Sequence, residues 1–297
     1  MAETSRGPAG RPDVRVLTVT STGGARPHTE IHGPDDGPTV VLVHGWACRA
    51  AFWYPVLRPL VAAGHRVVVY DQRGHGDTPA TPGSCSPEAL ADDLCAVLAA
   101  TLEEGRRAVL VGHSMGAMTI VAAADRPLLR AHAAAALLCS TGMDRLADES
   151  TVLPLRPGRW CSGGQRAFLR TTLGYGPLAP LFRRLIHHIT MGQGATRAQC
   201  DAVARMVRAC PRRARGEWGT VLAGLDLADR VGQLDIPVAL LQGEADRLTP
   251  PVHAHRIHGR LTRPDGFVRL PGVGHMTPIE ATDTVVATAA RLAKEQL

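Results

Sequence analysis

A serine flanked by two glycines is the clearest candidate for chemistry in this chain. Residues 112–116 read Gly-His-Ser-Met-Gly, directly after the apolar run 108–111 and directly before a helical pattern. This G-x-S-x-G arrangement between a strand and a helix is typical of a nucleophile held in a strained turn. The glycines leave room for neighbouring backbone, and the helix start favours an oxyanion nearby. We therefore predict that Ser114 is a nucleophile.

A serine hydroxyl reacts at neutral pH only with a base that is itself held by an acid, and both follow Ser114 along the chain. Asp246 comes just after the apolar run 238–241, and His275 comes just after the run 267–270. The carboxyl ends of parallel strands are where α/β sheets place their reacting groups. We therefore predict that His275 takes the proton from Ser114 and that Asp246 orients its imidazole.

Two other acidic residues are weaker candidates for the acid. Asp144 follows the apolar run 134–139, but its position better suits the start of the next helical pattern. Glu244 lies two residues before Asp246 and points the other way along an extended turn. We therefore rank both behind Asp246.

An acyl-transfer site also needs two backbone N–H groups aimed at the developing oxyanion. His44-Gly45-Trp46 follows the apolar run 39–43, and Met115 follows the nucleophile. We predict that the N–H groups of Trp46 and Met115 form this oxyanion hole, with Gly45 allowing the backbone its close approach. We expect His44 to bond the loop rather than to take part in chemistry.

The apolar runs that carry these residues alternate with helical patterns. Short uninterrupted runs, typical of strands buried on both faces, lie at residues 39–43, 66–70, 108–111, 134–139, 238–241 and 267–270. Helical patterns lie at 52–63, 87–102, 115–124, 251–257 and 282–295. Residues 13–20 and 28–32 have the alternation of an antiparallel hairpin. This order predicts an α/β fold with a mostly parallel sheet covered by helices on both faces.

Residues 143–231 break the alternation. They contain no convincing buried strand, and prolines punctuate their helix-like pieces, which are 178–190, 196–209 and 213–225. We predict a helical cap at 143–231, inserted into a core that comprises residues 1–142 and 232–297. We expect about the first 12 residues to be flexible.

Composition sets the broad class of the protein. The chain has 297 residues, 45% hydrophobic and 20% charged, which suffices for a sizeable core. It has no run of about 18 apolar residues for a membrane span, and residues 1–13 lack the apolar centre of a secretory signal. Its seven cysteines form no CxxC pair, which indicates free thiols in a reducing compartment. We therefore expect a cytoplasmic protein without a membrane span.

The expected chemistry needs neither a metal nor an organic cofactor. The cysteine spacing does not suit a zinc site. His255 and His258 share a helical face, but His253 does not, and no carboxylate completes a ligand set. We therefore expect no bound metal.

Positive charge is concentrated in the predicted cap. The net charge is +6, and residues 143–231 hold 14 Arg against 7 Asp and Glu. Five of these arginines lie close together, namely Arg205, Arg208, Arg212, Arg213 and Arg215. Two interpretations remain open: a solvated, salt-bridged face, or a site for a phosphate-bearing acyl carrier such as coenzyme A, which would indicate a thioesterase. With 4% aromatic residues and no recognisable binding motif, nucleic acid is not an expected partner.

Five large side chains are candidates for an apolar substrate pocket: Trp53, Phe168, Tyr175, Met191 and Trp218. Core packing explains each of them equally well. The sequence does not separate the two roles.

Taken together, these motifs resemble the α/β-hydrolase family over nearly the whole chain, from about residue 15 to residue 292. The segments 44–46, 70–76 (Tyr-Asp-Gln-Arg-Gly-His-Gly) and 112–116 look like the soluble bacterial esterase and lipase-like branch. The resemblance implies an eight-stranded sheet, a helical cap over the site, and a catalytic triad formed by Ser114, Asp246 and His275.

Other reactions of the resembled family fit less well. Epoxide hydrolases and haloalkane dehalogenases use Asp where this chain has Ser114, and hydroxynitrile lyases use a lysine near the site, whereas Lys294 is the only lysine here. Cofactor-free haloperoxidases, which are perhydrolases, usually have proline where this chain has Ala47.

We therefore expect hydrolysis of a carboxylic ester of a small or medium apolar substrate through an acyl-enzyme. The alternatives are a thioesterase, a lactonase, a C–C bond hydrolase using the same triad, a perhydrolase, and a non-catalytic protein that binds a small ligand.

Overall fold

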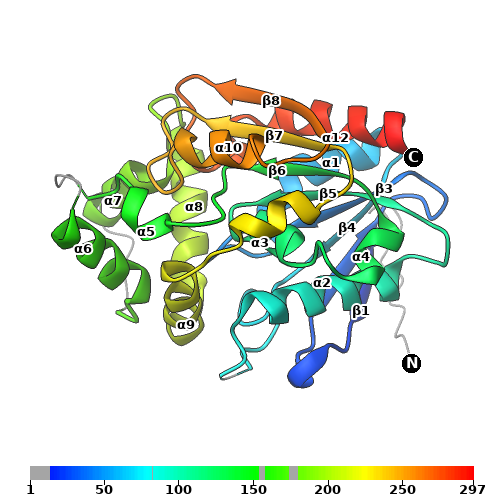
Figure 1. The fold of residues 1–297 in the computed structure, drawn as a ribbon, viewed down its shortest axis with the longest axis horizontal. Coiled ribbons are helices and arrows are strands. Elements are labelled where there is room, and N and C mark those ends of the chain that lie inside the picture. Colours follow the sequence, from blue (N-terminus) through cyan, green and yellow to red (C-terminus); the bar gives the residue numbers. More distant parts are fainter. Residues whose placement is uncertain (1–13, 82, 154–157, 174–179) are drawn as a thin grey trace.

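An eight-stranded sheet forms the centre of the computed structural model, which describes residues 14–81, 83–153, 158–173 and 180–297 (Figure 1). The strands are β1 (Val14–Thr18), β2 (His28–His32), β3 (Thr39–Val43), β4 (Arg66–Tyr70), β5 (Ala108–His113), β6 (Ala133–Cys139), β7 (Val238–Gly243) and β8 (Pro264–Leu270). Their order in the sheet is β1-β2-β4-β3-β5-β6-β7-β8. The strands from β4 to β8 pair in parallel, and only the pairings of β2 with β1 and with β4 are antiparallel. The predicted α/β fold with a mostly parallel sheet is confirmed.

Helices cover both faces of the sheet because the central strands send alternate side chains into two cores. Val41 and Val43 of β3 pack under α2 (Pro87–Thr101) and α3 (Met115–Ala122). Val40 and Leu42 of the same strand pack under α1 (Tyr54–Ala62) and α12 (Thr282–Gln296). The remaining short elements of this core are η1 (Thr22–Gly24), η2 (Ala50–Trp53), α4 (Pro127–His132), η3 (Ala228–Gln233), α10 (Pro251–His258) and α11 (Thr277–Glu280).

Between β6 and β7, the described residues form helices and no strand. These helices are α5 (Leu146–Glu149), α6 (Arg159–Arg170), α7 (Pro180–Thr190), α8 (Arg197–Ala209) and α9 (Arg212–Ala223), and we refer to them as the helical insertion. Figure 1 shows them gathered at one end of the sheet. A capping box between Thr196 and Gln199 fixes the start of α8.

The helical insertion is tightly packed where α6 meets α9. A Cβ atom at Gly219 would overlap the carbonyl of Leu169, and one at Gly216 would lie 2.6 Å from the side chain of Thr172. Two glycines of α9 therefore allow the end of α6 to approach its backbone.

In the described parts of the chain, no helix is both long enough and apolar enough to cross a membrane. The expectation of flexibility for about the first 12 residues falls outside the described residues.

Candidate active site

Ser114 stands in a sharp turn between β5 and α3. Its backbone has φ 52° and ψ −119°, a conformation that residues other than glycine rarely adopt. A Cβ atom at Gly116 would overlap the carbonyl oxygen of Val43, and one at Gly112 would lie 2.6 Å from the Cα of Ala117. The two glycines thus permit the close packing that holds Ser114 in its strained conformation.

Asp246 and His275 meet at the ends of the neighbouring strands β7 and β8. The Nδ1–H of His275 donates to Oδ2 of Asp246 at 2.8 Å, and both side chains are buried. The other carboxylate oxygen, Oδ1, accepts the backbone N–H groups of Leu248 and Thr249, each at 2.9 Å. These bonds fix the carboxylate and leave Nε2 as the outward-facing nitrogen of the imidazole.

The surroundings of Asp246 keep it ionised. Burial by itself raises its pKa, but the charge and hydrogen bond of His275, together with the hydrogen bonds from Thr249, outweigh this effect. The pKa of Asp246 is therefore held below its ordinary value. A carboxylate in this state can stabilise an imidazolium that forms on His275.

The side chains of Ser114 and His275 line one cavity, and the helical insertion supplies much of the remaining lining. The apolar lining from the insertion includes Leu146, Phe168, Leu185, Ile186, Ile189 and Val207. The structure thus brings the predicted nucleophile and base to the wall of one largely apolar cavity, with the predicted acid directly behind the base.

The two predicted oxyanion-hole residues lie close to this cavity: Trp46 lines it, and Met115 directly follows Ser114, which also lines it. Met115 is the first residue of α3, where the N–H has no acceptor within the helix, and Trp46 lies in the loop after β3. The N–H of the next residue, Ala47, donates to Nε2 of His75 at 3.1 Å. Among the described residues, neither the Trp46 N–H nor the Met115 N–H has an acceptor, so both are free to bind an oxyanion.

His44 secures the loop that carries Trp46. Its Nδ1–H donates to the carbonyl of Gly45 at 2.8 Å, and its Nε2 accepts the backbone N–H of Gln72 at 3.0 Å. The side chain of Gln72 in turn accepts a 2.7 Å hydrogen bond from Thr119 of α3. Burial lowers the pKa of His44 to about 4, so the ring stays neutral at neutral pH. The network connects the loop that carries Trp46 to α3, the helix that begins at Met115.

Ala47 has a left-handed backbone with φ 57°. A proline ring holds φ near −65°, and proline has no N–H to donate to His75. The loop conformation observed here is therefore incompatible with the proline that haloperoxidases usually carry at this position.

His113 supports the loop of the predicted base. Its Nε2–H donates to the backbone carbonyl of His275 at 2.9 Å, and the two rings lie 4.9 Å apart. Burial first, and then the charge of His275, lower the pKa of His113 to about 3. The ring therefore stays neutral beside the base.

Glu280, on α11, was not singled out by the sequence. Its carboxylate accepts the backbone N–H groups of Gly274 and Met276, the residues on either side of His275, each at 3.2 Å. It also accepts the N–H of Gly192, beyond the end of α7, at 2.6 Å. The only sequence signal was an acidic residue five positions after His275. One carboxylate thus holds the loop of the predicted base against the helical insertion.

The rival acids are engaged elsewhere. Asp144 pairs with Arg256 at 3.0 Å, and Glu244 pairs with Arg269 at 3.5 Å. Neither of them lines the cavity.

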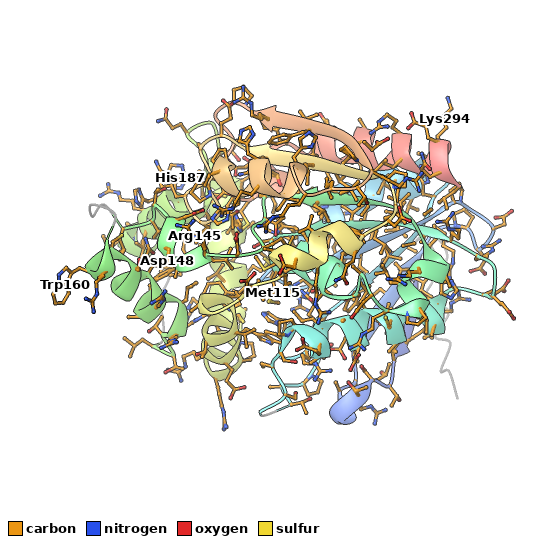
Figure 2. All side chains as sticks on the ribbon, in the orientation of Figure 1. Met115, Arg145, Asp148, Trp160, His187 and Lys294 are labelled. Carbon is orange, nitrogen blue, oxygen red and sulfur yellow. The ribbon has the colours of Figure 1, made fainter. Side chains whose placement is uncertain are left out.

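Lys294 is the only lysine of the chain, and it extends from α12 at the end of the molecule opposite the helical insertion (Figure 2). Met115, which follows Ser114, lies in the interior in the same view.

The predicted pocket residues are divided by the structure. Phe168 lines the cavity, and Tyr175 lies outside the described residues. Trp53, Met191 and Trp218 are packed into the cores instead, where their large apolar surfaces are completely or almost completely shielded from water. These three are a correction to the predicted pocket, whose apolar wall is formed mainly by leucine and isoleucine side chains.

The predicted arginine cluster is also divided. Four of the five side chains are exposed, namely those of Arg205, Arg208, Arg212 and Arg213. Arg213 pairs with Glu217 at 2.9 Å. Arg215 is 1% exposed and lines the cavity. The five arginines therefore do not form one face, and the structure gives no support to an acyl-carrier site built from all of them.

Comparisons with known proteins agree with this architecture. The AB hydrolase superfamily protein YfhM of Bacillus subtilis is 31% identical over 156 residues, which are 50% of this chain, and the match spans about half of that relative (51%). The bifunctional esterase/perhydrolase DCH of Acinetobacter calcoaceticus is 24% identical over 259 residues, covering 85% of this chain and 90% of that protein. A thermophilic esterase from Thermogutta terrifontis has the same fold, with a TM-score of 0.75 at 21% identity over 95% of this chain and 98% of that chain.

The family model described as the alpha/beta hydrolase family matches residues 40–289, which is most of the chain. The protein therefore belongs to the alpha/beta hydrolase family.

Proposed function

We propose that the protein hydrolyses carboxylic esters through an acyl-enzyme on Ser114. The observation that carries this proposal is the 2.8 Å contact between His275 and Asp246, which turns Nε2 of the imidazole away from the carboxylate while Ser114 lines the same cavity as the ring. A hydroxyl, an imidazole and a carboxylate in this order are the components of nucleophilic acyl transfer.

The reaction begins when Nε2 of His275 takes the proton from Ser114 and Oγ attacks the ester carbonyl. The negative charge on the carbonyl oxygen is bound by the backbone N–H groups of Trp46 and Met115. His275 then gives its proton to the departing alkoxide, which leaves the acyl group on Ser114. A water molecule, deprotonated by the same imidazole, releases the acid and restores the enzyme.

The helical insertion acts as a cap in this proposal. Its leucine and isoleucine side chains line the cavity beside Ser114, which suits a small or medium acyl chain with a largely apolar surface. The proposed cap corresponds to residues 143–231, inserted in a hydrolase core of residues 1–142 and 232–297.

Similarity to known proteins supports an ester as one of the substrates to test. The Acinetobacter calcoaceticus relative that covers most of this chain carries both esterase and perhydrolase in its name. The left-handed backbone of Ala47 disfavours the perhydrolase reaction because it excludes the proline typical of haloperoxidases. Esterase activity is therefore the first of the two to test.

The test is hydrolysis of p-nitrophenyl esters of increasing acyl length by the wild-type protein and by Ser114→Ala. Loss of a triad nucleophile costs on the order of a million-fold in kcat in a well-studied protease, so Ser114→Ala should reduce turnover to near background. Ser162→Ala, on α6 and outside the cavity, is the matched control and should keep wild-type activity. Comparable activity in wild type and Ser114→Ala would contradict the proposal.

A further inference from the structure

We propose that the cavity recognises an uncharged hydrogen-bond donor on the substrate, and that the amide oxygen of Gln165 is the acceptor that binds it. This inference rests on the proposed ester hydrolysis and narrows its substrate class. The preferred substrates are then esters whose acyl chain carries a hydroxyl or amide N–H group beyond an apolar stretch.

Gln165 is a polar residue on the buried face of α6. It follows Cys161 by one helical turn and precedes Phe168 and Leu169 by another, whereas all three arginines of α6 are exposed. Gln165 is 2% exposed, and it lines the cavity together with Phe168 and Leu169. A leucine would fill this face without burying a polar group, so packing alone does not explain a glutamine here.

A single hydrogen bond determines which end of the Gln165 amide is left for a ligand. Its Nε2 donates to the backbone carbonyl of Ser150, at the end of α5, at 3.2 Å. A carbonyl oxygen can only accept, so the NH₂ group must be the end that faces Ser150, and Oε1 is the other end.

The amide oxygen of Gln165 has no donor among the described residues, and it remains accessible to water. The side chain is almost completely shielded from the outer surface, so the space that this oxygen faces is the cavity that Gln165 lines. Buried polar groups are nearly always hydrogen-bonded, and an acceptor left unpaired is costly. The oxygen of Gln165 therefore offers a binding point to a donor that enters the cavity.

The hydroxyl groups in the cavity wall favour the same kind of ligand. Those of Ser150 and Thr190 donate to backbone carbonyls at 3.0 and 2.8 Å, and that of Thr249 donates to Asp246 at 2.8 Å. Their hydrogens are engaged within the protein, so these three side chains offer the cavity acceptors rather than donors. Like Gln165, they complement a donor on the substrate.

The rest of the lining determines what separates the donor from the ester and why the donor is uncharged. Much of the wall is formed by leucine, isoleucine and phenylalanine side chains, such as Leu185, Ile186 and Phe168. Apolar side chains favour methylene groups, and a charged group loses more on leaving water than a neutral amide oxygen returns. A hydroxyl or an amide N–H at the end of an apolar chain is therefore the complementary group.

The experiment compares p-nitrophenyl ω-hydroxyalkanoates of increasing length with their ω-methoxy isomers. Each pair has the same atoms, but the ether oxygen of the methoxy isomer cannot donate a hydrogen bond. We expect wild-type kcat/KM to favour the hydroxy ester by about 5- to 100-fold at the chain length that reaches Gln165, because the methoxy isomer leaves a buried acceptor unpaired.

Variants of Gln165 assign this preference to its amide oxygen. Gln165→Leu should abolish the preference, since leucine has a similar size and no acceptor, whereas Gln165→Glu keeps an acceptor and should retain part of it. Gln193→Leu, exposed in the turn after α7, is the matched control and should leave the preference unchanged. If Gln165→Leu does not fold, Gln165→Met replaces it, because methionine is flexible and only a weak acceptor.

Each outcome separates this inference from the proposed function. Equal kcat/KM for the two isomers at every chain length, or an unchanged preference in folded Gln165→Leu, overturns the role of Gln165 while ester hydrolysis stands. No hydrolysis of any of these esters overturns the proposed function. In that case, calorimetry with the methyl esters of the same acids still tests the inference. The wild-type protein should bind the hydroxy ester at least about fivefold more tightly than its methoxy isomer, and equal affinities would overturn the inference.

Discussion

The backbone N–H of His275 donates a 2.8 Å hydrogen bond to the carbonyl of Thr190, the last residue of α7. The N–H of Met276 donates to the same carbonyl at 3.2 Å, and Glu280 binds Gly192 just beyond it. The loop of the proposed base is thus attached to the helical insertion as well as to the sheet. The insertion therefore positions His275 in addition to forming the cavity wall.

Glu280→Gln should lower kcat by about 10- to 100-fold, the range expected when a catalytic group is slightly misplaced, with little change in KM. The amide can accept with one atom only, and its NH₂ group would oppose the N–H groups of Gly192, Gly274 and Met276. Steady-state kinetics on p-nitrophenyl butyrate measures the effect. Glu295→Gln, on the exposed side of α12, is the control. Lower stability with full kcat in Glu280→Gln would show a structural role only.

Asp246→Asn should leave the protein folded and reduce kcat by about 10⁴-fold, as the equivalent change does in a serine protease, because the amide favours the wrong tautomer of His275. Asp144→Asn should leave kcat nearly unchanged, since that carboxylate pairs with Arg256 away from the cavity. The same ester assay measures both variants. A larger loss of kcat in Asp144→Asn than in Asp246→Asn would reverse the assignment of the acid.

Ala47→Pro should destabilise the protein by about 1–3 kcal/mol or more and remove most of its esterase activity. Proline cannot adopt φ 57°, and it removes the N–H that binds His75. Ala47→Gly keeps the N–H and accepts a positive φ, so it is the matched control. Urea unfolding and ester hydrolysis test the pair. A stable Ala47→Pro variant with gained perhydrolysis would show that this loop readily adopts the haloperoxidase form.

The buried histidines should make the protein less stable in mild acid. Burial lowers the pKa of His44 to about 4 and the pKa values of His75 and His113 to about 3. The unfolded chain protonates the same rings near pH 6.5, so it binds more protons than the folded chain below that pH. The free energy of unfolding should therefore fall as pH drops from about 6.5 towards 4, by about 1.4 kcal/mol per pH unit for each ring.

Urea unfolding at several pH values between about 8 and 5 measures this slope. Ordinary carboxylates stay ionised over most of this range, so the histidines dominate it. His75→Gln should reduce the change in the free energy of unfolding per pH unit by the contribution of one histidine. A free energy of unfolding that does not change between pH 7 and 5 would contradict the assignment of neutral, buried rings.

The central strands β3 to β7 were predictable from sequence because they are buried on both faces, whereas β8, expected to be buried in the same way, is an edge strand with exposed residues. Uninterrupted apolar runs such as Thr39–Val43 and Arg66–Tyr70 coincide with strands β3 and β4. Helix α6 was not predicted, since the sequence of Arg159–Arg170 contains two adjacent glycines and few apolar residues. Its contact with the glycines of α9 stabilises it, and a contact of this kind does not appear in local sequence.

The pocket was less predictable than the residues around Ser114. Large side chains such as Trp53 and Trp218 suit a pocket and a core equally well, and packing placed them in the core. Arg213 and Arg215 are adjacent in a charge-rich stretch, but two residues along a helix turn the side chain by more than half a circle. Arg213 is therefore exposed to solvent, whereas Arg215 lines the cavity.

The most direct test of the central claim is to treat the protein with a p-nitrophenyl alkylphosphonate and to locate the adduct by mass spectrometry of its peptides. The account predicts a single adduct on Ser114, formed in the wild type and absent from Ser114→Ala, with release of one p-nitrophenol per protein. Ester hydrolysis by a protein that carries no adduct on Ser114, or an adduct on another residue, would contradict it.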